Sequence, residues 1–194
     1  MNVLSLFDGM SCGQIALNKI GIEYDNYYAS EIDKYAIKVT QKNYPNTIQL
    51  GSVVDVSGSD LPKIDLLIGG SPCQGFSFAG KQLNFEDERS KLFFEYVRIL
   101  KETKPKYFLL ENVKMKKEYQ DVISDLLGVK PILIDSALIT AGHRERLYWT
   151  NIPNITQPNN KNIVLKDILE NKVDEKYYLS KKRVNLIFNG VKYG

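Results

Sequence analysis

The stretch "NVLSLFDGMSCGQIALNKIG", residues 2–21, decides the fold of this chain. It begins with a short apolar run typical of a buried strand (2–7), passes through a glycine-containing loop (8–13), and ends in a helical pattern closed by another glycine. Nucleotide-binding βαβ units begin in this way, with a strand that turns tightly into a helix N-terminus. Taken alone, the glycines of the loop either only close the turn or help to hold a nucleotide.

The same alternation of strand and helix patterns continues to about residue 153. Six further runs of apolar, β-branched or aromatic residues predict strands, and three runs with helical apolar spacing predict helices between them. The strands are expected at 26–32, 47–53, 63–70, 105–113, 130–139 and 146–152, and the helices at 33–44, 89–104 and 119–128. Strands that alternate with helices form right-handed βαβ units. We therefore expect an α/β fold with a mostly parallel central sheet and helices on both faces.

A polar stretch rich in proline and asparagine, "NIPNITQPNNKN" (151–162), follows this region and is typical of a linker. Beyond it, the sequence has only two short helical patterns, which bring little core of their own. The sequence thus predicts one domain over residues 1–153 and a separate C-terminal region over residues 154–194.

The composition is that of an ordinary soluble protein, with 43% apolar and 25% charged residues among 194. No apolar stretch approaches the ~18 residues that span a bilayer, and the N-terminus does not resemble a signal peptide. We therefore expect a cytoplasmic protein with reduced cysteines and no membrane partner. Two cysteines and one histidine cannot form a four-ligand Cys/His zinc site without carboxylates, so no metal is expected. The net charge of +3 permits a nucleic-acid partner but does not argue for one.

Reactive side chains follow several of the predicted strands. Ligands bind at the carboxyl ends of the strands in an open α/β sheet, so these side chains should meet at one edge. Each also has a purely structural interpretation. The cysteine could be a small buried residue, and the charged groups could be solvated surface residues. A hydrolase based on His143 is disfavoured, since the arginines around it would oppose its protonation. The residues concerned are Asp8 to Gly13, Glu31, Ser71 to Gln74, Glu111, Arg144 and Arg146.

Five motifs in order make the chain, from Met1 to about Pro153, resemble the catalytic domain of the cytosine-5 DNA methyltransferases. They are "LFDGMSCGQIAL", "GGSPCQGFS", "NFEDERSKLFFEYVRIL", "LLENV" and "HRERLYW". The resemblance implies a Rossmann-like methyltransferase fold and transfer of a methyl group from S-adenosylmethionine to carbon 5 of cytosine, leaving S-adenosylhomocysteine. It also implies that the cytosine is flipped out of double-stranded DNA, because the reacting carbon is inaccessible in the stack.

By the same resemblance, Cys73 is the nucleophile that adds to carbon 6 of the base. Glu111, when protonated, donates a hydrogen bond at ring nitrogen 3. Arg146 and Arg144 hold the ring oxygen and orient Glu111. The cofactor is expected to contact Phe7, Asp8, Gly9, Met10, Ser11, Gly13, Glu31, Ile32, Ser52, Val53, Pro72 and Leu92.

The sequence departs from the family at two positions and in its extent. Ser52 stands where the family usually has an aspartate facing adenine, and Gly142 stands where it often has a glutamine. Family members also continue with a target-recognition region and a last helix, so we expect this chain to be truncated, or half of a split enzyme, and inactive alone. The alternatives are an RNA cytosine methyltransferase, an inactive cofactor-binding module and, more remotely, a nicotinamide dehydrogenase.

Overall fold

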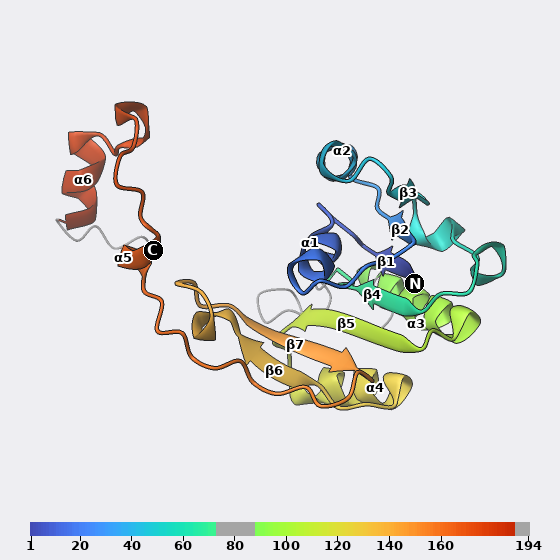
Figure 1. Ribbon diagram of the computed structural model, residues 1–194. Helices are drawn as coiled ribbons and strands as arrows, with labels where there is room; N and C mark the ends of the chain where they lie inside the picture. Colours follow the sequence, from blue (N-terminus) through green and yellow to red (C-terminus); the bar gives the residue numbers. More distant parts are fainter. Residues whose placement is uncertain (73–87, 189–194) are drawn as a thin grey trace.

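The computed structural model describes residues 1–72 and 88–188 and has a seven-stranded sheet at its centre (Figure 1). The strand order is β3-β2-β1-β4-β5-β7-β6. The strands are β1 (Asn2–Leu6), β2 (Asn26–Ser30), β3 (Ile48–Gln49), β4 (Leu66–Gly69), β5 (Tyr107–Val113), β6 (Ile132–Asp135) and β7 (Glu145–Thr150). The helices are α1 (Cys12–Lys19), α2 (Lys34–Asn43), α3 (Glu88–Thr103), α4 (Lys117–Leu127), α5 (Leu165–Ile168) and α6 (Lys181–Phe188).

Strands β1 to β5 all run parallel to one another, whereas β7 is antiparallel to both β5 and β6. The predicted α/β fold with a mostly parallel sheet is therefore confirmed. The reversed direction of β7 has one consequence for function. Its first residues lie at the edge of the sheet where the parallel strands end, so arginines at the start of this strand reach that edge.

Helices cover both faces of the sheet, as predicted. On one face, α3 and α4 contribute to a large core that includes Phe93, Tyr96 and Ile123 and contacts Trp149 of β7. On the other face, Leu17 of α1 belongs to a smaller cluster with side chains of β1, β2 and β4. Trp149 is fully buried, and its indole N–H donates to Ser124 Oγ of α4 at 3.0 Å, so the outer half of the sheet is fixed to α4.

Strands β3 and β6 each end four residues before the position that the sequence predicted. β3 ends at Gln49 because Gly51, with a φ of +76°, turns the chain into a 3-10 turn at Val53–Asp55. β6 ends at Asp135 because the side chain of this residue accepts from the N–H of Ala137 and starts another 3-10 turn. In both places a local polar or glycine turn overrides a run of residues with strand propensity.

The chain beyond β7 runs along the outer strand β6 before it leaves the sheet (Figure 1). The Gln157 side chain donates to the carbonyl of Leu133 at 2.6 Å, and the Lys161 N–H donates to the carbonyl of Leu138 at 2.8 Å. The later helices α5 and α6 lie apart from the sheet and expose many large apolar side chains. These include Leu165, Ile168, Leu169, Tyr177, Tyr178, Ile187 and Phe188.

The fully buried Tyr96 of α3 offers a test of this packing. Its hydroxyl has no hydrogen-bond partner within the described residues, and burial raises the pKa of Tyr96 far above its ordinary value. Tyr96→Phe should therefore raise the free energy of unfolding, by about 1 kcal/mol, because it removes an unpaired buried hydroxyl. Urea denaturation measures the change. Tyr27→Phe is the matched control, since the Tyr27 hydroxyl donates to Asp8 at 2.9 Å and its loss should be destabilising. A less stable Tyr96→Phe variant would contradict this account.

Candidate functional site

The loops after β1, β2, β4 and β5 meet the start of β7 at one edge of the sheet. This follows from the parallel register of the first five strands and the reversed direction of β7. Most of the site residues expected from the sequence belong to these segments. Glu111 lies within β5, Gly13 in the first turn of α1 and Leu92 on α3, whereas Ser52 and Val53 follow β3. Cys73 lies outside the described residues.

Glu111 and Arg146 form the central ion pair of this edge. Arg146 Nε lies 2.8 Å from Glu111 Oε1, and the two side chains are 18% and 34% exposed, respectively. In the ladder between β5 and β7, Glu111 is opposite Tyr148, so Arg146 is two residues away on the same face. Antiparallel pairing thus holds a guanidinium and a carboxylate together in a half-buried position, where their attraction is less weakened by water than at the surface.

The Glu111 carboxylate lies against the loop that follows β4. A Cβ atom on Gly70 would stand 3.0 Å from Glu111 Oε2, so the absence of a side chain at Gly70 allows this approach. The neighbouring Asn112 is buried, and its amide donates weakly to Ser71 O and Oγ at 3.4 and 3.3 Å. Cys73, the expected nucleophile, lies outside the described residues, two positions after Ser71.

Arg144 has a different environment from Arg146. It precedes β7 and is exposed, and in the described part of the chain no ion pair joins it to Glu111. The pKa of Tyr148 is raised by burial and by Glu111, and Arg146 and Arg144 oppose this shift. Arg146 and Tyr148 are two residues apart in β7 and therefore share one face of the sheet. Of the two arginines, the structure pairs Arg146 with Glu111.

A pocket of about 170 Å³ lies at the same edge of the sheet, where residues that follow β1, β2, β3 and β4 meet α3. Its walls are mostly apolar, and Glu31, which directly follows β2, adds a carboxylate. The lining residues are Phe7, Ser30, Glu31, Ile32, Ser52, Val53, Pro72 and Leu92. All of them except Ser30 are residues that the sequence led us to expect around the cofactor, and the structure brings them together from five separate segments.

Glu31 fastens the glycine loop to the end of β2. Its Oε2 accepts from the Gly9 N–H at 2.8 Å, and its Oε1 accepts from the N–H groups of Ile32 and Asp33 at 2.7 and 2.8 Å. Gly9 has a φ of +58°, in the left-handed region that favours glycine. A carboxylate has about four acceptor positions, so Glu31 can hold this loop and still accept from a ligand hydroxyl.

A polar network beneath the glycine loop was not foreseen from the sequence. Gln14 is 2% exposed, and its amide donates to Ser11 Oγ at 2.9 Å and to Thr47 Oγ1 at 2.8 Å. The Ser11 hydroxyl in turn donates to Asp8, which also accepts from Tyr27. The available signal was helical spacing, because Gln14 stands three residues before the buried Leu17 and so shares its face.

The close packing of α1 explains the second glycine of this loop. A Cβ atom on Gly13 would lie 2.3 Å from Ile68 Cδ1 and 2.5 Å from the Tyr27 hydroxyl oxygen. Burial and the nearby Asp8 both raise the pKa of Tyr27, so its hydroxyl remains a donor to Asp8. The shape of the loop therefore depends on the contacts of Asp8, Gly9, Ser11 and Gly13 with the residues packed under it. Met10, at the tip of the loop, is 56% exposed.

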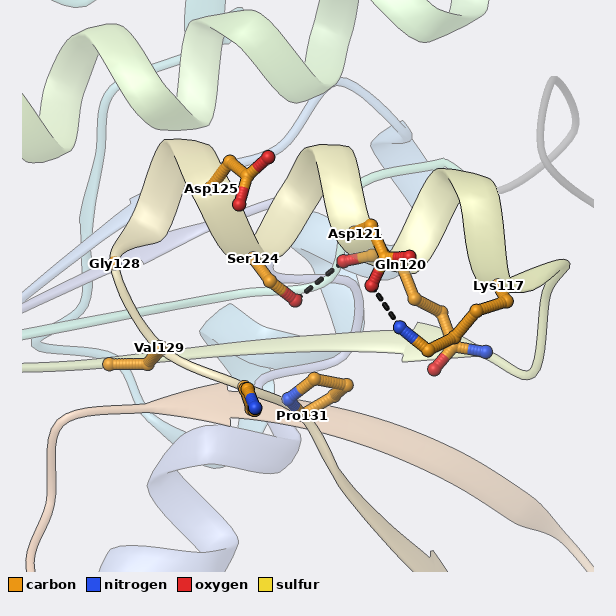
Figure 2. Close-up of a pocket in the computed structure, with 9 residues that line it drawn as sticks. Lys117, Gln120, Asp121, Ser124, Asp125, Gly128, Val129 and Pro131 are labelled. Atoms are coloured by element: carbon orange, nitrogen blue, oxygen red, sulfur yellow. Dashed lines mark hydrogen bonds and ion pairs between the residues drawn. The ribbon is translucent and has the colours of Figure 1, made fainter.

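A wider pocket of about 620 Å³ lies along α4 and the turn to β6 (Figure 2). Figure 2 shows Ser124 and Gln120 joined by a hydrogen bond and Lys117 facing Asp121, with which it forms an ion pair. These polar groups satisfy one another, and none of the expected site residues lines this pocket. We assign it no part in the site.

Metal-binding clusters and membrane-spanning helices are both absent from the described ranges. Within residues 1–72 and 88–188, no three His, Cys, Asp or Glu side chains gather as a metal ion would require. None of the helices described is both long enough and apolar enough to cross a lipid bilayer.

Comparison with known proteins places this geometry in a family. Residues 1–124 match the family model of C-5 cytosine-specific DNA methylases. The chain is 35% identical to the orphan methyltransferase M.SPRI of Bacillus phage SPR, over 95% of this chain and 53% of that protein. It is 32% identical to the orphan methyltransferase M.Rho11sI of Bacillus phage rho11s, over 98% of this chain and 48% of that protein.

The fold agrees with this assignment. The solved structure of the S. pombe Dnmt2 methyltransferase superposes with a TM-score of 0.70 at 18% identity, over 97% of this chain and 65% of that one. The chain spans about half the length of the curated relatives it matches. The motifs, the fold and the match over most of the sequence agree: the chain belongs to the C-5 cytosine-specific DNA methylase family.

Proposed function

We propose that this chain carries the catalytic centre of an enzyme that transfers a methyl group from S-adenosylmethionine to carbon 5 of cytosine in DNA. One observation carries the proposal: the Glu111–Arg146 pair adjoins Gly70, three residues before Cys73. A proton donor, a cation and a thiol are the groups that activation of a pyrimidine ring requires.

The pocket lined by Phe7, Glu31 and Leu92 has the chemistry that S-adenosylmethionine needs. Its apolar walls, Phe7, Val53 and Leu92, suit the flat adenine ring, and the Glu31 carboxylate suits the hydroxyl donors of the ribose. Ser52 offers adenine one modest polar contact. When bound, the cofactor would supply an electrophilic methyl group. Pro72, which directly precedes Cys73 in the sequence, is one of the residues that would hold it.

The residues of this chain then have distinct tasks. The Cys73 thiolate adds to carbon 6 of the cytosine, which pushes electrons into the ring and makes carbon 5 nucleophilic. Glu111, carrying a proton once the base is bound, donates it toward ring nitrogen 3, while Arg146 orients Glu111 and balances the charge on the ring oxygen. After methyl transfer, carbon 5 loses its proton to a solvent water and the Cys73 thiolate leaves. The proton at ring nitrogen 3 then returns to Glu111, which restores both the ring and the enzyme.

We further propose that activity requires the target-recognition region typical of the family, in the same chain or as a second one. The exposed apolar side chains of α5 and α6 support this, because such surfaces are normally covered by a partner. Tritium transfer to duplex DNA and to RNA, with and without the C-terminal region of a relative, tests both ideas. We expect methylation of DNA only in its presence. Methyl transfer to RNA but not to DNA would overturn DNA as the substrate. Efficient sequence-specific methylation of DNA by residues 1–194 would overturn the need for the target-recognition region.

The role of Glu31 gives a prediction on cofactor affinity. Glu31→Ala should weaken S-adenosylmethionine binding by roughly 1.5–3 kcal/mol, because it removes a charged hydrogen-bond acceptor and releases the Gly9 N–H. Isothermal titration calorimetry measures this. Asp33→Ala is the control, since Asp33 caps α2 through the N–H groups of Tyr35 and Ala36 and does not line the pocket. Equal affinities for Glu31→Ala and the unchanged protein would exclude Glu31 from the cofactor site.

A further inference from the structure

The turn between β6 and β7 is organised by a single carboxylate, that of Asp135. Its Oδ1 accepts from the N–H of Ala137 at 3.0 Å and from the N–H of Arg144 at 2.9 Å, so it ties the two ends of the turn together. A second hydrogen bond across the turn runs from the Ser136 N–H to the carbonyl of Arg144, at 3.2 Å. These backbone bonds hold the pKa of Asp135 below its usual range, and the carboxylate remains charged.

The second oxygen of Asp135 holds a histidine. His143 Nδ1 lies 2.6 Å from Asp135 Oδ2, and the imidazole is 72% exposed. The carboxylate thus occupies one ring nitrogen and orients the ring, while the rest of the imidazole, with Nε2, faces solvent. The turn does not need this contact for its shape, because backbone N–H groups already fix it and an exposed ion pair adds little stability.

The position of His143 relates it to the substrate edge. In the ladder between β6 and β7, Asp135 is opposite Glu145, so the turn projects from the end of the sheet that carries Glu111 and Arg146. The charged groups nearest in the two strands and the turn are Asp135 itself, the adjacent Arg144, and Glu145, which is paired with Lys114. A nucleic acid whose base reaches Glu111 must bring its backbone past this rim.

We propose that His143 binds a backbone phosphate of the nucleic-acid substrate through Nε2, and that Asp135 is the positioning residue that aims it. The inference rests on the proposed function only for the identity of the ligand, duplex DNA. His143 is the one histidine of the chain, and the sequence alone suggested no role for it, since only its flanking arginines were visible there. An imidazolium held by a carboxylate donates from Nε2, which suits a phosphate oxygen.

Binding of the full chain to a duplex oligonucleotide, followed by fluorescence anisotropy over a range of salt concentrations, tests this. At pH 6.0, where histidine side chains are commonly charged, His143→Ala should weaken binding by about 3- to 10-fold. It should also lower the slope of log K against log salt by about 0.9, the amount expected for one phosphate contact. His143→Lys should restore both. Lys63→Ala, which removes an exposed cation just before β4 at the opposite edge, is the matched control.

Asp135→Asn tests the positioning role, because asparagine keeps the oxygen that accepts the two backbone N–H groups but loses the charge. Introduced alone, Asp135→Asn should weaken DNA binding. Added to His143→Ala, it should weaken binding no further than His143→Ala does by itself. Affinity and salt slope unchanged in His143→Ala would overturn the inference while DNA methylation still supported the proposed function. No binding of duplex DNA by the unchanged protein at low salt would also overturn the inference, whereas tritium transfer in the presence of the C-terminal region of a relative tests the proposed function separately.

Discussion

Cys73→Ser should reduce methyl transfer below detection in an otherwise active enzyme, a loss of the order of 10⁴-fold or more. The reason is chemical, because a serine hydroxyl is far less acidic than a thiol and cannot supply the anion that adds to carbon 6. The same variant should form no covalent complex with DNA containing 5-fluorocytosine, in which fluorine replaces the proton that must leave carbon 5. Tritium transfer and denaturing gel electrophoresis measure these two outcomes.

The chain supplies its own control for this experiment. Cys12 is the other cysteine, and it is exposed at the first turn of α1. Cys12→Ser should keep both the turnover and the covalent complex. Near-normal turnover in Cys73→Ser, or loss of the covalent complex only in Cys12→Ser, would show that the nucleophile has been assigned to the wrong residue.

Glu111→Gln should lower kcat by about 10²- to 10⁴-fold, the usual contribution of a positioned proton donor. Glutamine retains the size of the side chain and an oxygen that can accept from Arg146, so the pair at 2.8 Å can survive in a neutral form. What it cannot do is transfer a proton toward ring nitrogen 3. Single-turnover kinetics with saturating DNA isolate this step from binding.

A carboxylate–guanidinium pair far from the sheet edge serves for comparison. On α3, Arg98 Nη1 lies 3.0 Å from Glu102 Oε1, and Glu102 also accepts from the Gly58 N–H. Glu102→Gln should leave kcat unchanged and alter only stability. A kcat for Glu111→Gln within a few-fold of the unchanged enzyme would remove Glu111 from the catalytic step and leave it a partner for Arg146.

Much of the fold follows from patterns that are local in sequence. The turn from β1 into α1 could be predicted because glycines interrupt an apolar run, and α3 because its apolar residues recur at helical spacing. The direction of β7 could not, since alternation of side chains is the same whichever way a strand runs. The end of β6 at Asp135 depends on a side chain that accepts from the backbone after it, which competes with strand propensity.

The candidate site also has residues that could be predicted from local sequence patterns and residues that could not. Glu31, Glu111 and Arg146 could be placed at one edge because each lies close to the end of a strand that reaches it, and family motifs surround Glu111 and Arg146. Gln14 could not be recognised as part of the network under the glycine loop, because its partner Thr47 lies 33 residues away. The pairing of His143 with Asp135 was hidden for a related reason, since it depends on how the turn between the two strands closes.

The insertion of β7 between β5 and β6 constrains the order in which the molecule can assemble. As the polypeptide leaves the ribosome, β6 emerges before β7, its pairing partner in the described part of the chain, and one side of β5 lacks β7 during that interval. The outer half of the sheet, including Arg146 and the Trp149 contact to α4, can therefore form only after residue 150 has been synthesised. Nascent chains halted shortly before this point should be open to proteases around β6, and they should become resistant once the hairpin is complete.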